Sequence, residues 1–170
     1  ARWALLSAPP VPAITSTAMT ATTTAASGTA HPLLTTVVPV AGSGERVFSG
    51  RISIDTHPWV ADHVLLDTVV VPGTAFVEMV MKAGADLGCE LLDELTLEAP
   101  LVVTGAAVAT IQVSVEHAGP DGRCPVTVYS RPDDDPSAEW TRHAAGYVAP
   151  ATAMAGPGAA ALAELAAQSW

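Results

Sequence analysis

Basic side chains are scarce in this sequence of 170 residues, which has a single lysine, Lys82, and six scattered arginines. Against 17 acidic residues, these give a formal net charge of −10. Proteins that bind nucleic acid neutralise phosphates with clustered Lys and Arg, so nucleic acid is excluded as a partner. An acidic balance favours solubility but does not identify a substrate.

Charged residues of both signs make up only 14% of the chain, whereas hydrophobic residues make up 49%. Such a chain covers much of its surface with small neutral groups or packs that surface against another protein. We therefore expect a surface that pairs with other domains or with a second copy, as in a homodimer.

Cysteine is also rare, with only Cys89 and Cys124, and the two do not form a CxxC motif. This spacing excludes the usual cysteine-based metal and redox motifs. A disulfide is not expected, because nothing marks the chain as secreted. His117 and His143 lie on separate predicted elements without ligand spacing, so we predict no metal site.

Long apolar runs are absent, and none reaches the roughly 20 residues that a membrane helix needs. The first residues lack a basic region followed by an unbroken apolar core, which is a poor match to a signal peptide. These two absences predict a cytoplasmic protein that does not insert into a membrane.

The composition divides the chain into three parts. Residues 1–30 are rich in Ala, Thr, Ser and Pro and are predicted to be a flexible linker. Residues 31–150 carry the periodic patterns of an ordered domain. Residues 151–170 are rich in Pro, Gly and Ala and are predicted to be a connector.

Within the ordered part, residues 73–88 have apolar side chains at helical spacing and form the best predicted helix. Alternating patterns predict strands at 47–55, 94–101, 108–116, 125–130 and 140–148, and the apolar run 64–71 reads as a further strand. One long helix with an antiparallel meander of four strands after it predicts an α+β protein with a single hotdog fold, in which a curved sheet wraps the helix.

His63 is the strongest candidate for chemistry. It leads the apolar run that ends at Pro72-Gly73, where the predicted helix begins. A neutral imidazole can remove a proton, and a helix N-terminus can stabilise negative charge on a thioester oxygen. A lone histidine on an apolar run is also often structural, as His57 beside Pro58 and Trp59 is expected to be.

Several phrases of the sequence occur together, in order and spacing, in one known family. The sequence resembles a dehydratase domain of a modular type I polyketide synthase over residues 31–150. The phrases are HPLL (31–34), HPWVADH (57–63), HVLLDTVVVPGTAFVE (63–78), LDELTLEAPLVV (92–103), PVTVYSRPDDD (125–135) and EWTRHAAGYVAP (139–150).

The resemblance implies roles for four residues. The family motif HxxxGxxxxP places His63 as the catalytic base, with Pro72 and Gly73 at the start of the central helix facing the thioester oxygen. Asp67 stands where the motif has glycine, near the substrate entrance. The family's domain is a double hotdog, and its second half supplies an aspartic acid that has no counterpart here.

The predicted function is that of the N-terminal half of such a dehydratase, incomplete or inactive alone. It would act on a β-hydroxyacyl chain carried on the phosphopantetheine of an acyl carrier protein, beside other synthase domains and without a cofactor. One alternative is a degenerate remnant with a structural or dimerisation role, favoured by Asp67. Another is a hotdog thioesterase or acyl-binding module, for which Glu78 is the only candidate and is expected to be exposed.

Overall fold

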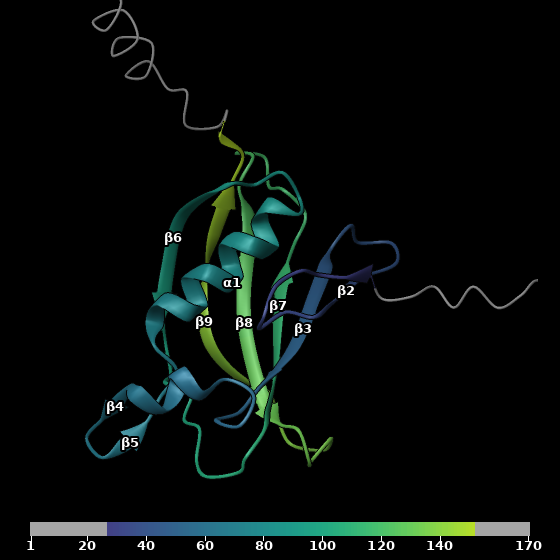
Figure 1. The fold of residues 1–170 in the computed structure, drawn as a ribbon. Helices are drawn as coiled ribbons and strands as arrows, with labels where there is room; N and C mark the ends of the chain where they lie inside the picture. Colours follow the sequence, from purple (N-terminus) through teal and green to yellow (C-terminus); the bar gives the residue numbers. More distant parts are fainter. Residues whose placement is uncertain (1–26, 152–170) are drawn as a thin grey trace, which may run out of the picture.

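The computed structural model describes residues 27–151, where seven antiparallel strands curve around one long helix (Figure 1). In spatial order the strands are β1 (Ser27–Gly28), β2 (Thr36–Pro39), β3 (Arg46–Ile52), β7 (Ala109–Val115), β8 (Cys124–Pro132), β9 (Thr141–Ala149) and β6 (Leu91–Leu97). The other elements are η1 (Pro58–Asp62), β4 (Val64–Leu65), β5 (Thr68–Val69) and the helix α1 (Gly73–Ala85). This arrangement confirms the predicted single hotdog fold.

The ends of the chain fall mostly outside the described residues, including the predicted connector beyond residue 151 and residues 1–26 of the predicted linker. The sheet begins within the last residues of that predicted linker, because β1 pairs antiparallel with β2 through Ser27 and Val37. Strand β1 thus lies within the predicted linker, four residues before His31.

Helix α1 lies across the concave face of the sheet, as its sequence periodicity predicts (Figure 1). Phe76, Val80 and Ala83 are buried on its inner side together with Met79. Gly84 packs against the sheet so closely that an added Cβ would lie 2.5 Å from the Cys89 carbonyl oxygen. The interior glycine therefore marks close packing, as the sequence suggested.

The strands agree with their predicted alternation, but their order differs from a simple meander. Ile111, Val113 and Val115 of β7 point into the core. Strands β7, β8 and β9 follow one another in the sheet, whereas β6 pairs with β9 and forms the edge. The predicted meander, in which the four strands after the helix pair in chain order, is wrong. Helix α1 carries the chain across the sheet before β6, which therefore pairs with β9 and not with β7.

The run 64–71 is not one strand, as predicted, but mainly the hairpin of β4 and β5. Leu66 and Asp67 both have positive φ, 50° and 62°, and form the two-residue turn that joins the strands. Such a turn matches the right-handed twist of a hairpin. The apolar composition hid this turn, because leucine is an uncommon residue at positive φ.

The segment that follows β1 is held by His31, whose Nδ1 accepts hydrogen bonds from the amides of Leu33 and Leu34, each at 3.1 Å. The proton of the neutral ring is therefore on Nε2, which is buried and has no hydrogen-bond partner among the described residues. Burial lowers the pKa of His31, against the opposing charge of Glu78, whose carboxylate lies 3.7 Å from Nε2.

This arrangement predicts a pH-dependent stability. A histidine with a lowered folded-state pKa contributes stability that is present above its unfolded pKa of 6.5 and is lost as the pH falls below it. The free energy of unfolding, measured in urea, should therefore fall more steeply below pH 6.5 for the wild type than for His31→Asn. The asparagine amide oxygen can still accept hydrogen bonds from the two backbone amides. His117→Asn, at an exposed loop position, should follow the wild type; parallel curves for all three proteins would contradict the prediction.

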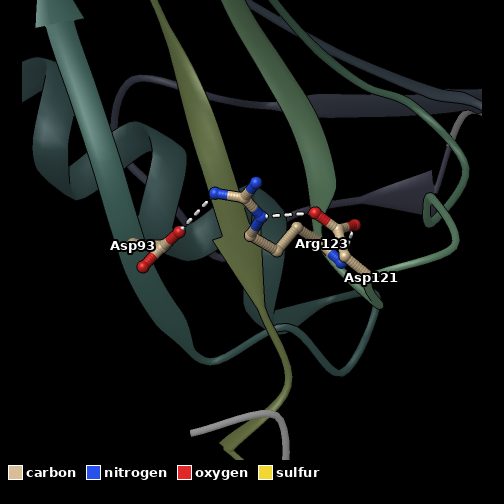
Figure 2. Close-up of polar contacts among 3 residues, drawn as sticks. All are labelled: Asp93, Asp121 and Arg123. Atoms are coloured by element: carbon tan, nitrogen blue, oxygen red, sulfur yellow. Dashed lines mark hydrogen bonds and ion pairs between the residues drawn. The ribbon is translucent and has the colours of Figure 1, made fainter.

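A polar cluster ties the edge strand β6 to the rest of the sheet (Figure 2). Arg123, at the start of β8, donates to Asp93 of β6 at 2.9 Å and to Asp121 at 2.7 Å. Its guanidinium lies 4.6 Å from the ring centroid of Tyr147 on the intervening strand β9. Exposed ion pairs contribute little stability one by one, so the cluster matters chiefly because it spans three strands.

The two cysteines meet in the core although they are 35 positions apart. The Sγ atoms of Cys89 and Cys124 lie 3.2 Å apart as free thiols. Burial, together with the hydrogen bond that it shares with Cys89, raises the pKa of Cys124 to about 11. A thiol with a raised pKa is a weak nucleophile, which is consistent with a packing role for the pair.

Candidate active site

His63 lies at the base of the β4–β5 hairpin and is held there by Val70. Its Nδ1 lies 2.9 Å from the Val70 carbonyl oxygen, and its own carbonyl accepts the Val70 amide at 3.1 Å. A carbonyl can only accept, so Nδ1 carries the proton in the neutral ring and Nε2 keeps its lone pair. Because His63 is exposed, this Nε2 is available as a base.

The N-terminus of α1 comes three residues after Val70. Pro72 occupies the N-cap position and makes no side-chain hydrogen bond to the first turn, which also holds no acidic residue. The first amides of a helix have no intrahelical acceptor, and the helix dipole favours negative charge at this end. The amides of Gly73 and Thr74 can therefore receive an anionic oxygen, whereas that of Ala75 bonds the Pro72 carbonyl at 3.0 Å.

A cleft of about 280 Å³ borders this helix end. Its lining comes from the chain before α1, from Gly73 and Phe76 of the helix, and from the end of β6; the residues are Val70, Val71, Gly73, Phe76, Leu97, Glu98, Ala99 and Pro100. A Cβ on Gly73 would lie 2.9 Å from Leu97 Cδ1, so a side chain there would fill the cleft. The structure thus brings the helix end and Val70, the residue that holds His63, to one opening, which His63 itself does not line.

Of the residues predicted to contact substrate, only Gly73 lines this cleft. Pro72 precedes it as the N-cap, and Asp67 lies in the turn at the outer end of the hairpin, exposed to solvent. The positive φ of Asp67 explains why glycine suits this position and why Asp, which tolerates left-handed geometry, can replace it. Substrate binding by Pro72 and Asp67 stays a prediction.

His57 has a structural environment, as the sequence suggested. Its Nε2 lies 3.2 Å from the Pro32 carbonyl oxygen, and its Nδ1 lies 2.8 Å from Thr56 Oγ1. Both ring nitrogens are thus engaged, in contrast to the open Nε2 of His63. The bond to Pro32 also joins the HPWVADH segment to the HPLL segment.

Glu98 lines the cleft although the sequence gave no reason to select it. Its Oε2 accepts a hydrogen bond from Arg142 Nε at 2.8 Å, which raises the pKa of that guanidinium. A carboxylate bound to a guanidinium acts as an acceptor, so Glu98 is not arranged to donate a proton. Only the pairing of β6 with β9 brings Glu98 and Arg142 together.

Between residues 27 and 151, no group of three or more His, Cys, Asp or Glu side chains is placed to hold a metal ion. In the same range no helix has both the length and the apolar character needed to cross a membrane.

The fold and the site together define a hotdog protein with an exposed histidine held by the segment that leads into the uncapped N-terminus of its central helix. Residues 31–131 match the family model described as polyketide synthase dehydratase domain. Among relatives, the pikromycin polyketide synthase component PikAII of Streptomyces venezuelae is 47% identical over 120 residues, covering 70% of this chain and 3% of the relative. The mycoketide-CoA synthase of Mycobacterium tuberculosis is 41% identical over 126 residues, covering 74% of this chain and 3% of that protein.

Solved structures give the same result. The dehydratase domain from the terminal module of the rifamycin polyketide synthase superposes with a TM-score of 0.70 and is 42% identical, covering 75% of this chain and 46% of that one. The erythromycin dehydratase has a TM-score of 0.68 and 41% identity, covering 72% of this chain and 46% of that one. The chain belongs to the polyketide synthase dehydratase family and is the N-terminal hotdog half of such a domain. It spans less than half the length of these solved domains.

Proposed function

We propose that this chain supplies the base of a dehydratase that acts on a β-hydroxyacyl thioester carried by the phosphopantetheine arm of an acyl carrier protein. The observation that carries the proposal is the orientation of His63. The Val70 carbonyl holds the Nδ1 proton at 2.9 Å, which leaves Nε2 of His63 free, and Val70 itself lies two residues before Pro72, the N-cap of α1.

In the proposed reaction, Nε2 of His63 takes the proton from the carbon between the thioester and the hydroxyl-bearing carbon. The electrons left behind move onto the thioester carbonyl oxygen, whose negative charge the free amides at the start of α1 stabilise. The carbon–oxygen bond to the β-hydroxyl then breaks, and the hydroxyl leaves as water after receiving a proton. The product is an α,β-unsaturated thioester.

The proton for the leaving water comes, in this proposal, from an acid on a second hotdog half. The cleft borders β6, which has a single partner strand, β9, in the sheet of the described residues. A domain that packs beside this edge reaches the cleft directly, so it can place an acid opposite His63. The reaction uses only proton transfers, and we expect it to need no cofactor.

The proposed partners follow from the same role. The acyl carrier protein delivers the substrate, and other domains of a polyketide synthase flank the chain in the cytoplasm. A homodimer is a further proposal, supported by the exposed apolar residues of the hairpin, where Val64, Leu65 and Leu66 are 56%, 60% and 91% exposed.

A degenerate remnant with a structural role is the second candidate, because Asp67 replaces the motif glycine. The geometry of Asp67 weakens this alternative, since its side chain lies in an exposed turn rather than in the cleft. A thioesterase is supported less, because Glu78 is 65% exposed on the outer side of α1.

The test compares this chain alone with the same chain joined to the second half of a related dehydratase, using a β-hydroxyacyl-pantetheine substrate. We expect enoyl product only from the joined protein, because the isolated half has a base but no acid. Product from the chain alone at a comparable rate would refute the need for a second half. A folded joined protein that stays inactive, both as wild type and as Asp67→Gly, would favour the remnant.

A further inference from the structure

A second buried histidine, His143 on β9, has no part in the proposed proton transfers. Strand β9 is irregular there, since Arg142 pairs with Tyr129 and Ala144 pairs with Val128, which leaves His143 as an extra residue. A bulge of this kind re-aims a side chain. Here it allows His143 and Ala144, adjacent in sequence, both to be buried.

The ring of His143 makes a hydrogen bond on each side. Nδ1 lies 3.0 Å from the Ala99 carbonyl oxygen, and Nε2 lies 2.7 Å from Oγ of Ser130 on β8. Because a carbonyl only accepts, the neutral ring carries its proton on Nδ1 and accepts the Ser130 hydroxyl at Nε2. The Ala99 carbonyl thus fixes the tautomer of His143, and the hydroxyl of Ser130 donates to the nitrogen that remains unprotonated.

His143 also holds the same segment through its backbone. Its carbonyl accepts the amide of Glu98 at 2.8 Å and that of Ala99 at 3.4 Å. The imidazole stacks on Phe76 of α1 with ring centroids 5.9 Å apart and an angle of 26° between the planes. Glu98, Ala99 and Phe76 all line the cleft at the helix N-terminus, so His143 contacts two of its walls.

From these contacts we infer that Ser130 and His143 are positioning residues, which set the shape of the acyl cleft by fixing the segment 98–100 and the ring of Phe76. This inference rests on the proposed function, because it assigns the cleft to the acyl chain. About 280 Å³ is room for roughly nine water-sized groups, so a small shift of one wall changes which acyl chains fit. The pair thus contributes to substrate selection.

A direct chemical role for the pair does not fit its surroundings. His143 is 3% exposed and Ser130 is 5% exposed, and each nitrogen of the imidazole already has a partner. His63, by contrast, makes the same Nδ1 contact to a carbonyl of the cleft but leaves Nε2 open. One histidine is arranged as a base, and the other as a support.

The first measurement uses the 170-residue chain and needs no catalysis. In ¹⁵N-histidine NMR spectra, the neutral ring of His143 should show the Nδ1–H form alone. Ser130→Ala removes the donor to Nε2, so the Nε2 signal should move downfield toward that of an unbonded ring nitrogen. Exchange of the Glu98 amide should speed up about tenfold, the effect of losing one buried hydrogen bond. Ser130→Thr, which keeps a hydroxyl, should restore the wild-type spectrum. Ser114→Ala, a serine of β7 whose hydroxyl bonds Glu45, should leave it unchanged.

The second measurement uses the joined dehydratase and substrates of increasing acyl bulk. Ser130→Ala should raise KM about tenfold for the preferred substrate, change kcat less, and narrow the preference among acyl chains. Ser130→Thr and Ser114→Ala should retain the wild-type preference. His143→Asn, whose amide can still donate to Ala99, should lie between wild type and Ser130→Ala.

The outcomes separate this inference from the proposed function. An inactive wild-type joined protein would count against the dehydratase, whereas the NMR spectra would still decide the roles of Ser130 and His143. An active enzyme in which Ser130→Ala keeps the wild-type KM and preference would overturn the inference. So would a His143 Nε2 signal that does not change when the Ser130 hydroxyl is removed.

Discussion

Replacing His63 by asparagine in the joined dehydratase is expected to lower kcat by about 10²- to 10⁴-fold, the usual contribution of a positioned base. Asparagine suits this test because its amide group can still donate to the Val70 carbonyl, which His63 Nδ1 contacts at 2.9 Å. The substitution therefore removes the Nε2 lone pair while keeping the local hydrogen bond. Enoyl product formation measures the rate, and circular dichroism verifies the fold.

His57 provides the matched control, since it lies in the same seven-residue segment and has both ring nitrogens engaged. His57→Asn should reduce stability by about 1 kcal/mol through loss of the Pro32 bond, while kcat stays within a few-fold of the wild type. If His63→Asn retains full activity while His57→Asn loses it, the base has been assigned to the wrong histidine.

Replacing Gly50 by alanine should destabilise the fold by about 3 kcal/mol or more, at the upper end of overpacking effects. Gly50 lies on the buried face of β3, where the segment containing Leu33 and Leu34 crosses the strand. A Cβ at this position would be 1.8 Å from the Leu33 carbonyl oxygen and 3.2 Å from Leu34 Cα. Backbone cannot yield as the end of a side chain can, so this segment must move out of the core.

Gly28 of β1 is the control, because a Cβ there would have only an ordinary contact, 3.9 Å from the Thr35 carbonyl oxygen. Gly28→Ala should change the free energy of unfolding by less than about 0.5 kcal/mol. Urea unfolding monitored by circular dichroism compares the two variants with the wild type. Equal midpoints for Gly50→Ala and wild type would show that the Leu33–Leu34 segment packs elsewhere.

The central helix shows how far periodicity alone could be read. The spacing of Phe76, Val80 and Ala83 predicted both the helix and its buried side, and these residues are buried. Helical spacing is a local property, because side chains three and four positions apart share a face in any helix. The order of strands is not local, and the position of β6 at the far edge of the sheet, beside β9, could not be predicted from alternation.

The candidate site shows the same division. The sequence placed His63 just before the helix N-terminus, and the family resemblance gave it a role. The sequence did not reveal the hydrogen bond from His63 to Val70. It also did not reveal the turn at Leu66 and Asp67, because an apolar residue such as leucine rarely adopts positive φ. The bulge at His143 was also hidden, since alternation assigns opposite faces to adjacent residues.

The sequence by itself determined the one long helix, the alternating strands and the family, because each depends on the pattern of neighbouring residues along the chain. Only the tertiary structure decided which partners each polar group meets. Glu98 meets Arg142, and His143 meets Ser130 and Ala99, through strands that are 13 to 44 positions apart. Such contacts depend on strand order, register and a bulge, which arise from packing the whole sheet around the helix.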